Sequence, residues 1–210
     1  MYFWHPAYDD YPVVGSPWQQ CNACNVWRTQ LLNSWRKNHM LSFVQDFRLP
    51  SETEWEYAAR GGLDNNPYPW GGPYIRNSRG CFLGNFKPLR GRYMEDGGFH
   101  TVKANSYHPN DFGLYCMSGN VAEWCRTAFD ESVYEYGHDM NTEYIYHALD
   151  HDPPSMKRKV VRGGSWKDIG YYLQTGTRSY EYQDTAKSYI GFRSVMNYLG
   201  RGGPNKEGDF

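Results

Sequence analysis

Residues 50–62 contain a full set of helix start and stop signals, and this short helix is the best-specified element of the chain. Pro50 blocks an earlier start, Ser51 is an N-cap, and Glu54 three residues later completes a capping box. Gly61, followed by a second glycine, supplies a left-handed cap at the other end. The sequence therefore predicts a helix over residues 51–60. Its expected packing face consists of Trp55, Ala58 and Ala59.

A longer helix is predicted over residues 17–37. Ser16 is its expected N-cap, Pro17 takes the first helical position and Gln19 completes a capping box. Apolar residues then recur at helical spacing, at Trp18, Cys21, Cys24, Trp27, Leu31, Leu32 and Trp35. The two cysteines permit two interpretations: a redox or zinc half-site, or two thiols on a buried helix face. Because the chain has no second CxxC and no CxxCH, we favour the buried face.

The remainder of the chain predicts short strands joined by long, ordered loops. Residues 63–113 are rich in Gly, Pro and Asn. Strand-like pieces follow at residues 114–117, 121–124, 159–162 and 189–196. The chain holds 19 Tyr, 10 Phe and 8 Trp, and such rings bury apolar area while keeping one polar handle, which suits ordered loops. Two main helices followed by many short strands indicate an α+β fold.

Composition excludes several classes of function. With 22 Lys+Arg against 23 Asp+Glu, the formal net charge is −1, which does not favour a nucleic-acid surface. No apolar run is long enough to span a bilayer, and the N-terminus has no signal-peptide pattern. The five cysteines are an odd number, so at least one is expected to be unpaired within the chain.

Four short strings, in order, resemble the formylglycine-generating-enzyme (sulfatase-modifying factor) domain family. They are residues 48–60 (RLPSETEWEYAAR), 119–124 (GNVAEW), 162–166 (RGGSW) and 191–193 (GFR). The resemblance implies the family's fold, a loop-rich variant of the C-type-lectin architecture. It also implies a domain over residues 1–199 that lacks its N-terminal part, and residues 200–210 are expected to be a disordered tail by composition.

The resemblance further implies structural calcium. One set of ligands would be backbone oxygens near Gly119 and Val121 together with the side chain of Glu123. The second would consist of Asn85, the backbone of Phe86, Asp96 and the backbone near Gly98. Carbonyl and carboxylate oxygens are the ligands that calcium prefers. The alternative at both places is a hydrogen-bonded turn without a metal, and the sequence leaves both interpretations open.

The family's catalytic thiols are missing from this chain. The enzyme uses copper bound by two cysteine thiolates, and the corresponding positions fall at Gly170 and Thr175. Hydrogen and hydroxyl cannot replace the soft ligands that copper(I) requires. No cysteine follows Cys125. Among the seven histidines, His147 and His151 have HxxxH spacing, but they lie in the loop-like insertion over residues 130–157 and not on one predicted element, so they do not suggest an iron centre. We therefore predict no catalytic cofactor and no enzymatic activity.

Longer strings resemble one branch, the gliding-motility lipoprotein K family. These are residues 68–74 (YPWGGPY), 76–91 (RNSRGCFLGNFKPLRG) and 171–193 (YYLQTGTRSYEYQDTAKSYIGFR). The resemblance implies a lipoprotein on the periplasmic face of the bacterial outer membrane. There it would form a large ring with another subunit of the type IX protein-secretion machinery, which also supports gliding. Its membrane contact would be a lipid anchor that this chain does not include.

Ring assembly requires interfaces, and six tyrosines are candidates because aromatic rings are favoured at protein interfaces. They are Tyr134, Tyr136, Tyr144, Tyr146, Tyr171 and Tyr172. The alternative for these rings is packing within the chain's own loops. Two other functions remain open: a metal-dependent oxidase or sulfur-transfer enzyme with unrecognised ligands, and a lectin-like module that binds glycan or peptidoglycan.

Overall fold

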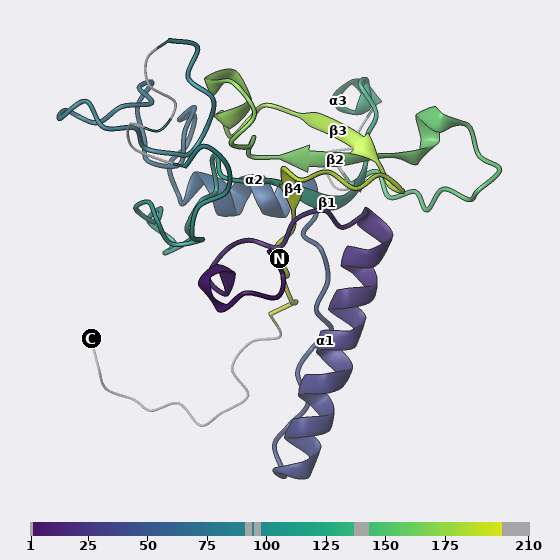
Figure 1. Ribbon diagram of the computed structural model, residues 1–210. Helices are drawn as coiled ribbons and strands as arrows, with labels where there is room; N and C mark the ends of the chain where they lie inside the picture. The colour runs from purple at the N-terminus through teal and green to yellow at the C-terminus, as the bar shows by residue number, and fades with distance from the viewer. Residues whose placement is uncertain (1, 91–93, 95–97, 137–142, 199–210) are drawn as a thin grey trace, which may run out of the picture.

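The computed structural model describes residues 2–90, 94, 98–136 and 143–198. Its α-helices are α1 (Trp18–Asn38), α2 (Glu52–Arg60) and the short α3 (Val133–Tyr136), and its strands are β1 (Ala122–Ala128), β2 (Arg158–Arg162), β3 (Ser179–Tyr182) and β4 (Ile190–Gly191). Three 3-10 turns are η1 (Pro6–Tyr8), η2 (Pro154–Lys157) and η3 (Gly170–Leu173). The predicted α+β, loop-rich layout with two main helices is confirmed (Figure 1). The predicted disordered tail, residues 200–210, lies outside the described residues, which end at residue 198.

The four strands form one mixed sheet in the order β3-β2-β1-β4. β2 pairs antiparallel with both β1 and β3, whereas β1 pairs with β4 in parallel. Successive side chains of a strand point to opposite faces. Accordingly Trp124 and Val161 join the core cluster of Trp18 and Cys21 at the base of α1. Their neighbours Cys125 and Val160 join Trp55 of α2 in a second cluster, so the two helices cover opposite faces of the sheet.

The predicted N-cap, capping box and glycine C-cap of α2 are all present in the structure. Ser51 Oγ accepts a hydrogen bond from the Glu54 amide at 3.1 Å, and Glu54 Oε2 accepts one from the Ser51 amide at 2.8 Å. Gly61 ends the helix at a φ of 61°. Trp55 and Ala59 are buried as predicted, and Ala58 packs beside them.

The start of α1 differs from the prediction. Its N-cap is Pro17, and no side chain caps the helix, so the expected capping box of Ser16 and Gln19 is wrong. The helix begins at Trp18, one residue later than predicted, so the N-cap position falls on Pro17, which has no side-chain acceptor. The Ser16 carbonyl accepts a hydrogen bond from Trp124 Nε1 of the sheet at 3.2 Å. The buried-face interpretation of the cysteines holds for Cys21 only, because Cys24 is exposed.

The strand predictions are right in part. Residues 121–124 and 159–162 fall in or beside β1 and β2, but residues 114–117 form no strand, because Cys116 has a φ of 50° and interrupts the extended run. In the predicted strand 189–196, only β4 pairs in the sheet, and Val195 forms an isolated bridge with Arg48. No helix among the residues described here combines the length and apolar character needed to cross a membrane.

Candidate functional site

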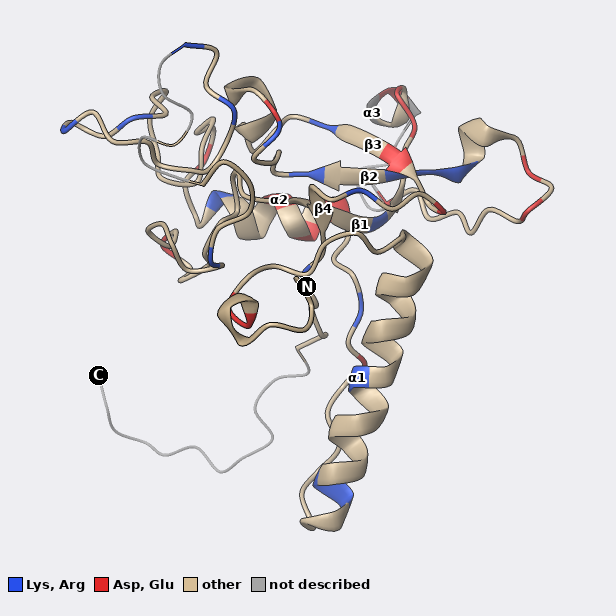
Figure 2. Cartoon of the chain, in the orientation of Figure 1, with Lys and Arg blue, Asp and Glu red and all other residues tan. Residues whose placement is uncertain are grey.

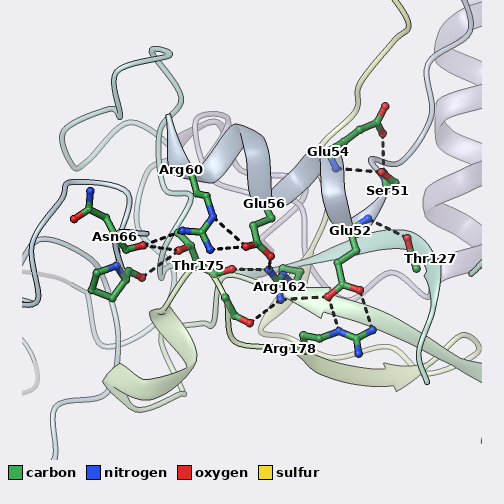
Figure 3. A network of polar contacts seen from close by, with 12 residues as sticks. Ser51, Glu52, Glu54, Glu56, Arg60, Asn66, Thr127, Arg162, Thr175 and Arg178 are labelled. Carbon is green, nitrogen blue, oxygen red and sulfur yellow. Dashed lines mark hydrogen bonds and ion pairs between the residues drawn. The ribbon is translucent and has the colours of Figure 1, made fainter. Parts of the chain in front are cut away.

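A buried ion-pair network supports the loop between β2 and β3, which contains both expected cysteine positions. Arg162, at the end of β2, has a side chain that is 0% exposed. Its Nη1 lies 3.2 Å from Glu52, and its Nη2 donates to Glu56 and, at 2.5 Å, to the carbonyl of Thr175. Figure 3 shows the guanidinium between α2 and this loop. A single side chain thereby joins the helix, the sheet and the loop.

Two further arginines extend the network. Arg178 donates through Nε and Nη2 to Glu52 at 2.7 and 2.9 Å, and through Nη1 to the carbonyl of Asp130 at 2.9 Å. Arg60 pairs with Glu56 at 2.6 Å one turn away on α2. Backbone carbonyls thus accept from several donors that the two carboxylates do not use, whereas Nε of Arg162 is buried without a hydrogen-bond partner.

The two expected cysteine positions are described and contain no thiol. Thr175 is 0% exposed; its amide donates to the Pro67 carbonyl at 2.8 Å and its hydroxyl to the Asn66 carbonyl at 3.2 Å. Gly170 begins η3, and a Cβ at this position would meet Ile75 at an ordinary 3.7 Å. A threonine hydroxyl engaged with backbone and a glycine do not fit a copper(I) centre, which requires soft sulfur ligands.

Glu123 is held by protein donors. Arg193 donates to both of its oxygens, at 2.5 and 2.6 Å, and Trp55 Nε1 donates to Oε2 at 2.7 Å. Burial alone would lower the pKa of Arg193, but the adjacent Glu123 charge and its hydrogen bonds raise it overall. Since each carboxylate oxygen already accepts from Arg193, the arrangement favours the hydrogen-bonded turn. Calcium at Glu123 stays a prediction.

The structure brings the two predicted calcium strings together through their backbones. Gly119 has a φ of 83°, and a Cβ there would lie 2.6 Å from the Asn85 carbonyl oxygen. The Asn120 amide donates to the same oxygen at 2.7 Å. Glycine is therefore required at this close crossing of two loops. Val121, the other backbone candidate in this string, is buried.

The second predicted calcium set is described only in part, because Asp96 lies outside the described residues. Asn85 donates through Nδ2 to the His100 carbonyl at 2.7 Å. Phe86 belongs to a hydrophobic cluster beneath η3. Gly98 borders a large cavity. Over the described ranges, no three His, Cys, Asp or Glu side chains group as a metal site would need.

All five cysteines are free thiols. Burial raises the pKa of Cys21 to about 12, and burial together with the nearby Glu123 raises that of Cys116 to about 11. Burial also raises the pKa of Cys125 well above its usual value. Thiols in this state are poor nucleophiles and poor metal ligands, because the thiolate is the reactive form.

The interface tyrosines separate into two groups. Tyr171 and Tyr172, in η3, are 58% and 40% exposed. Tyr144 and Tyr146 are partly buried, and the Tyr146 hydroxyl donates to Asp152 at 2.8 Å, so this pair follows the loop-packing alternative. The side chains of two further candidates lie outside the described part: Tyr134 and Tyr136.

Sequence analysis missed an aromatic cavity of about 810 Å³. Its lining combines the N-terminal segment with loops far along the chain, and includes Tyr2, Tyr8, Tyr11, Phe99, His100, Trp166 and Lys187. The rings of His100 and Trp166 lie 4.6 Å apart at one wall. The tyrosine-rich start of the chain was the available signal, but only the fold shows which loops it faces.

Residues 4–198 match the family model described as sulfatase-modifying factor enzyme 1-like domain. The chain belongs to this family. It is 34% identical over 191 residues to inactive C-alpha-formylglycine-generating enzyme 2 of Bos taurus, covering 88% of this chain and 50% of that protein. It is 30% identical to the formylglycine-generating enzyme of Streptomyces coelicolor, covering 88% of this chain and 52% of that one. The chain thus spans about half the length of these relatives.

Solved structures share the fold. PvdO from Pseudomonas aeruginosa superposes with a TM-score of 0.67 at 22% identity, covering 88% of this chain and 61% of that one. Treponema denticola variable protein 1 gives a TM-score of 0.62 at 23% identity, with coverages of 89% and 71%. The resemblance carried by the four short strings is therefore confirmed at the level of family and fold.

Proposed function

We propose that this protein is a non-catalytic structural subunit of the type IX secretion and gliding-motility machinery. One observation supports the non-catalytic role above the others. At the positions expected for the family's two cysteines, the chain has Gly170 and a buried Thr175 whose hydroxyl bonds to backbone. An oxidase of this family depends on two thiolates that these residues cannot supply.

Two further points support a structural role. The ion pairs of Arg162 attach the loop between β2 and β3 to α2, and an anchored loop of this kind suits a subunit that presents a surface to partners. A relative from Bos taurus is itself named an inactive formylglycine-generating enzyme, so loss of activity has a parallel in the family. The secretion role rests on residues 68–74, 76–91 and 171–193, which resemble the gliding-motility lipoprotein K family.

In this proposal the protein lies on the periplasmic face of the bacterial outer membrane, attached by a lipid anchor. It assembles with another secretion subunit into a large ring. Tyr171 and Tyr172 are exposed and belong to one of the long resembling strings, so they are candidates for contact with the partner subunit.

The test is affinity purification of the full-length protein from its native envelope, with mass spectrometry of partners and imaging of particles. We expect a large ring that contains a second secretion subunit. Recovery as a monomer without partners would overturn the proposal. Metal analysis of the same sample addresses the enzymatic alternative, which requires stoichiometric copper or iron.

A second candidate function, a lectin-like module for glycan or peptidoglycan, is favoured by the aromatic cavity. Rings that line a cavity of about 810 Å³ offer stacking faces, and Lys187 adds a donor. The test is thermal melting with peptidoglycan fragments and unrelated oligosaccharides. A saturable rise in Tm that Trp166→Ala abolishes would support this function, and an unchanged Tm would exclude it for those ligands.

A further inference from the structure

The part of α1 that extends beyond the core exposes a row of large apolar side chains. Trp27, Leu31 and Trp35 stand four residues apart, which places them on one side of the helix. Their exposed fractions are 59%, 54% and 50%. Single exposed hydrophobic residues are common, but a contiguous row containing two tryptophans is typical of an interaction surface. We call these three residues the α1 face.

The chain covers the opposite side of this helix itself. The segment after α1 runs back along it, where Asn33 exchanges two hydrogen bonds with the Val44 backbone, at 3.2 and 2.9 Å. Closer to the core, Thr29 Oγ1 accepts a bond from the Phe47 amide at 2.8 Å. The helix therefore turns its polar side toward its own chain and its apolar side toward solvent, the reverse of a usual surface helix.

Charge indicates the chemistry of the partner. From residue 17 to residue 45 the chain contains no Asp or Glu, and its basic residues are Arg28, which lies over the Phe47 ring at 4.4 Å, Arg36, which donates to the Ser42 carbonyl, and Lys37. These side chains flank the α1 face and give this part of the helix a positive charge. Figure 2 shows α1 with blue segments and no red one. A surface that pairs with the α1 face should therefore be acidic and apolar.

The same chain has such a surface elsewhere. Residues 127–156 contain no Lys or Arg and seven acidic residues, Asp130, Glu131, Glu135, Asp139, Glu143, Asp150 and Asp152. Within the described residues 143–156, which we call the acidic segment, Ile145, Leu149 and Met156 are 44%, 59% and 41% exposed. Asp150 is exposed beside Leu149. Glu143 pairs with Arg126 of its own chain at 2.5 Å, so the negative charge that this segment offers comes from Asp150 and Asp152. With the exposed apolar side chains beside them, these carboxylates complement the positively charged helix around the α1 face.

The two surfaces of one molecule do not meet. The acidic segment contacts the base of its own α1, where the rings of His147 and Trp18 lie 5.8 Å apart. Trp35 is about 25 Å farther along the helix axis, given a rise of about 1.5 Å per residue. In Figure 1 the helix points away from the sheet and from the loop that precedes β2. Contact between the surfaces therefore requires two molecules.

We propose that the α1 face of one copy binds the acidic segment of a second copy. Because two different surfaces meet, the contact is heterologous, and its repetition generates a ring or a filament. A two-fold contact between α1 helices is disfavoured because it would bring two helices of the same positive charge together. This inference rests on the proposed structural role and specifies how neighbouring copies in the assembly would join.

The first test is sedimentation velocity of the purified chain over a wide range of concentration. We expect reversible association that weakens with added salt. The variant Trp27→Ser/Leu31→Ser should weaken it by at least about tenfold, because it removes the apolar centre of the contact. Tyr74→Ser is the matched control, since it removes a ring that is 75% exposed elsewhere on the surface. Association equal to that of the wild type in the double variant, or no association at all, would overturn the proposal.

The second test is charge reversal, because it separates the two surfaces. Lys37→Glu and Asp150→Lys should each weaken association by about threefold to tenfold, and their combination should restore it. Lys87→Glu, an exposed lysine outside both surfaces, is the control. Additive loss without restoration would overturn the pairing.

Oxidative crosslinking adds a positional readout: Leu149→Cys should crosslink to Cys24 of another copy, whereas a Cys24–Cys24 dimer would show the two-fold contact instead.

Failure of this inference is distinguishable from failure of the proposed function. If the native envelope yields a ring that also forms with Trp27→Ser/Leu31→Ser, the ring role stands and the α1 contact is wrong. If the purified chain associates as described but the envelope yields no secretion subunit, the contact stands and the secretion role is wrong.

Discussion

Arg162 shows why particular charged residues occur in the interior of this fold. A guanidinium has five donors in a fixed fork, and here it connects carboxylates on α2 with carbonyls of the loop after β2. Burying such a charge is costly unless its donors find partners, and here both Nη atoms do while Nε does not. The resulting network attaches this loop to α2, and that attachment does not depend on a catalytic role for the loop.

Removing Arg162 should therefore destabilise the protein strongly. Arg162→Ala leaves Glu52 and Glu56 without their central partner, and we expect a loss of about 3–5 kcal/mol in the free energy of urea unfolding. Arg60→Ala breaks the partly exposed pair with Glu56 and should cost less than about 1 kcal/mol. If Arg162→Ala does not fold, Arg162→Lys should give a measurable intermediate loss. Equal losses for the Arg162 and Arg60 variants would contradict this account.

Lys159 is a buried base whose described neighbours are a ring and a carbonyl. Its side chain is buried, Nζ lies 4.1 Å above the Trp18 ring and donates to the Tyr146 carbonyl, and burial lowers its pKa to about 8. Between about pH 8 and the unfolded value near 10.5, the unfolded chain binds a proton that the folded chain does not. This group therefore makes stability rise with pH across that window, and its full cost is present below about pH 8.

Lys159→Met should remove that cost. We expect the variant to exceed the wild type by about 1 kcal/mol at pH 7, because methionine fills similar volume without a buried charge. The difference should shrink as pH approaches 10. Thermal melting of both proteins across this pH range measures it, and a difference independent of pH would show that burial of the charge is not its cause.

At the scale of elements, α2 is the clearest case of local determination. Its start depends on reciprocal hydrogen bonds between Ser51 and Glu54, and Arg48 binds the same carboxylate at 2.6 Å. Together these contacts lower the pKa of Glu54 to about 2, with the Arg48 hydrogen bond as the largest cause. The stabilisation from Glu54 is therefore present above about pH 4.5 and is lost as pH falls toward 2.

Ser51→Ala should cost about 1 kcal/mol in unfolding free energy, because it removes the acceptor for one orphan amide of α2. Ser16→Ala is the matched control: Ser16 precedes α1 but its side chain does not cap that helix, so we expect little change. Chemical denaturation of both variants gives the comparison. A Ser16→Ala loss as large as that of Ser51→Ala would contradict the assignment of the α1 cap.

Helix existence was predictable from the sequence and helix packing was not. The signals at Ser51 and Gly61 are local, so α2 could be placed within a residue or two. Periodicity also placed α1, but it could not show which side faces the sheet. In the structure the polar residues Asn25 and Thr29 of α1 are buried, whereas Trp27 is 59% exposed. The reason is that the Phe47 amide donates a hydrogen bond to Thr29 and the Ser194 hydroxyl donates one to Asn25. The pairing of Glu123 with Arg193, 70 residues later, depends on tertiary structure in the same way.

At the scale of the whole molecule, a small mixed sheet organises long loops. Core clusters lie on both faces of the sheet, and a third cluster of Tyr68, Phe86 and Leu173 holds the loop layer beneath η3. Family motifs could predict this scaffold because their glycines and arginines stand where loops cross. The aromatic cavity and the α1 face could not be predicted, since each combines surfaces that only the complete fold defines.

The same architecture predicts a graded reactivity of the five thiols toward an aromatic disulfide reagent. Cys24 is exposed and should react first, whereas Cys81 and Cys116 are partly covered and should react at least about tenfold more slowly. Cys21 and Cys125 are buried in the two core clusters and should react only after unfolding. Cys24→Ser should abolish the fast phase and leave the others unchanged. Because the two core thiols report on opposite faces of the sheet, rapid labelling of either in the native protein would show that its helix does not cover that face. A total below five in denaturant would show that two of these thiols form a disulfide.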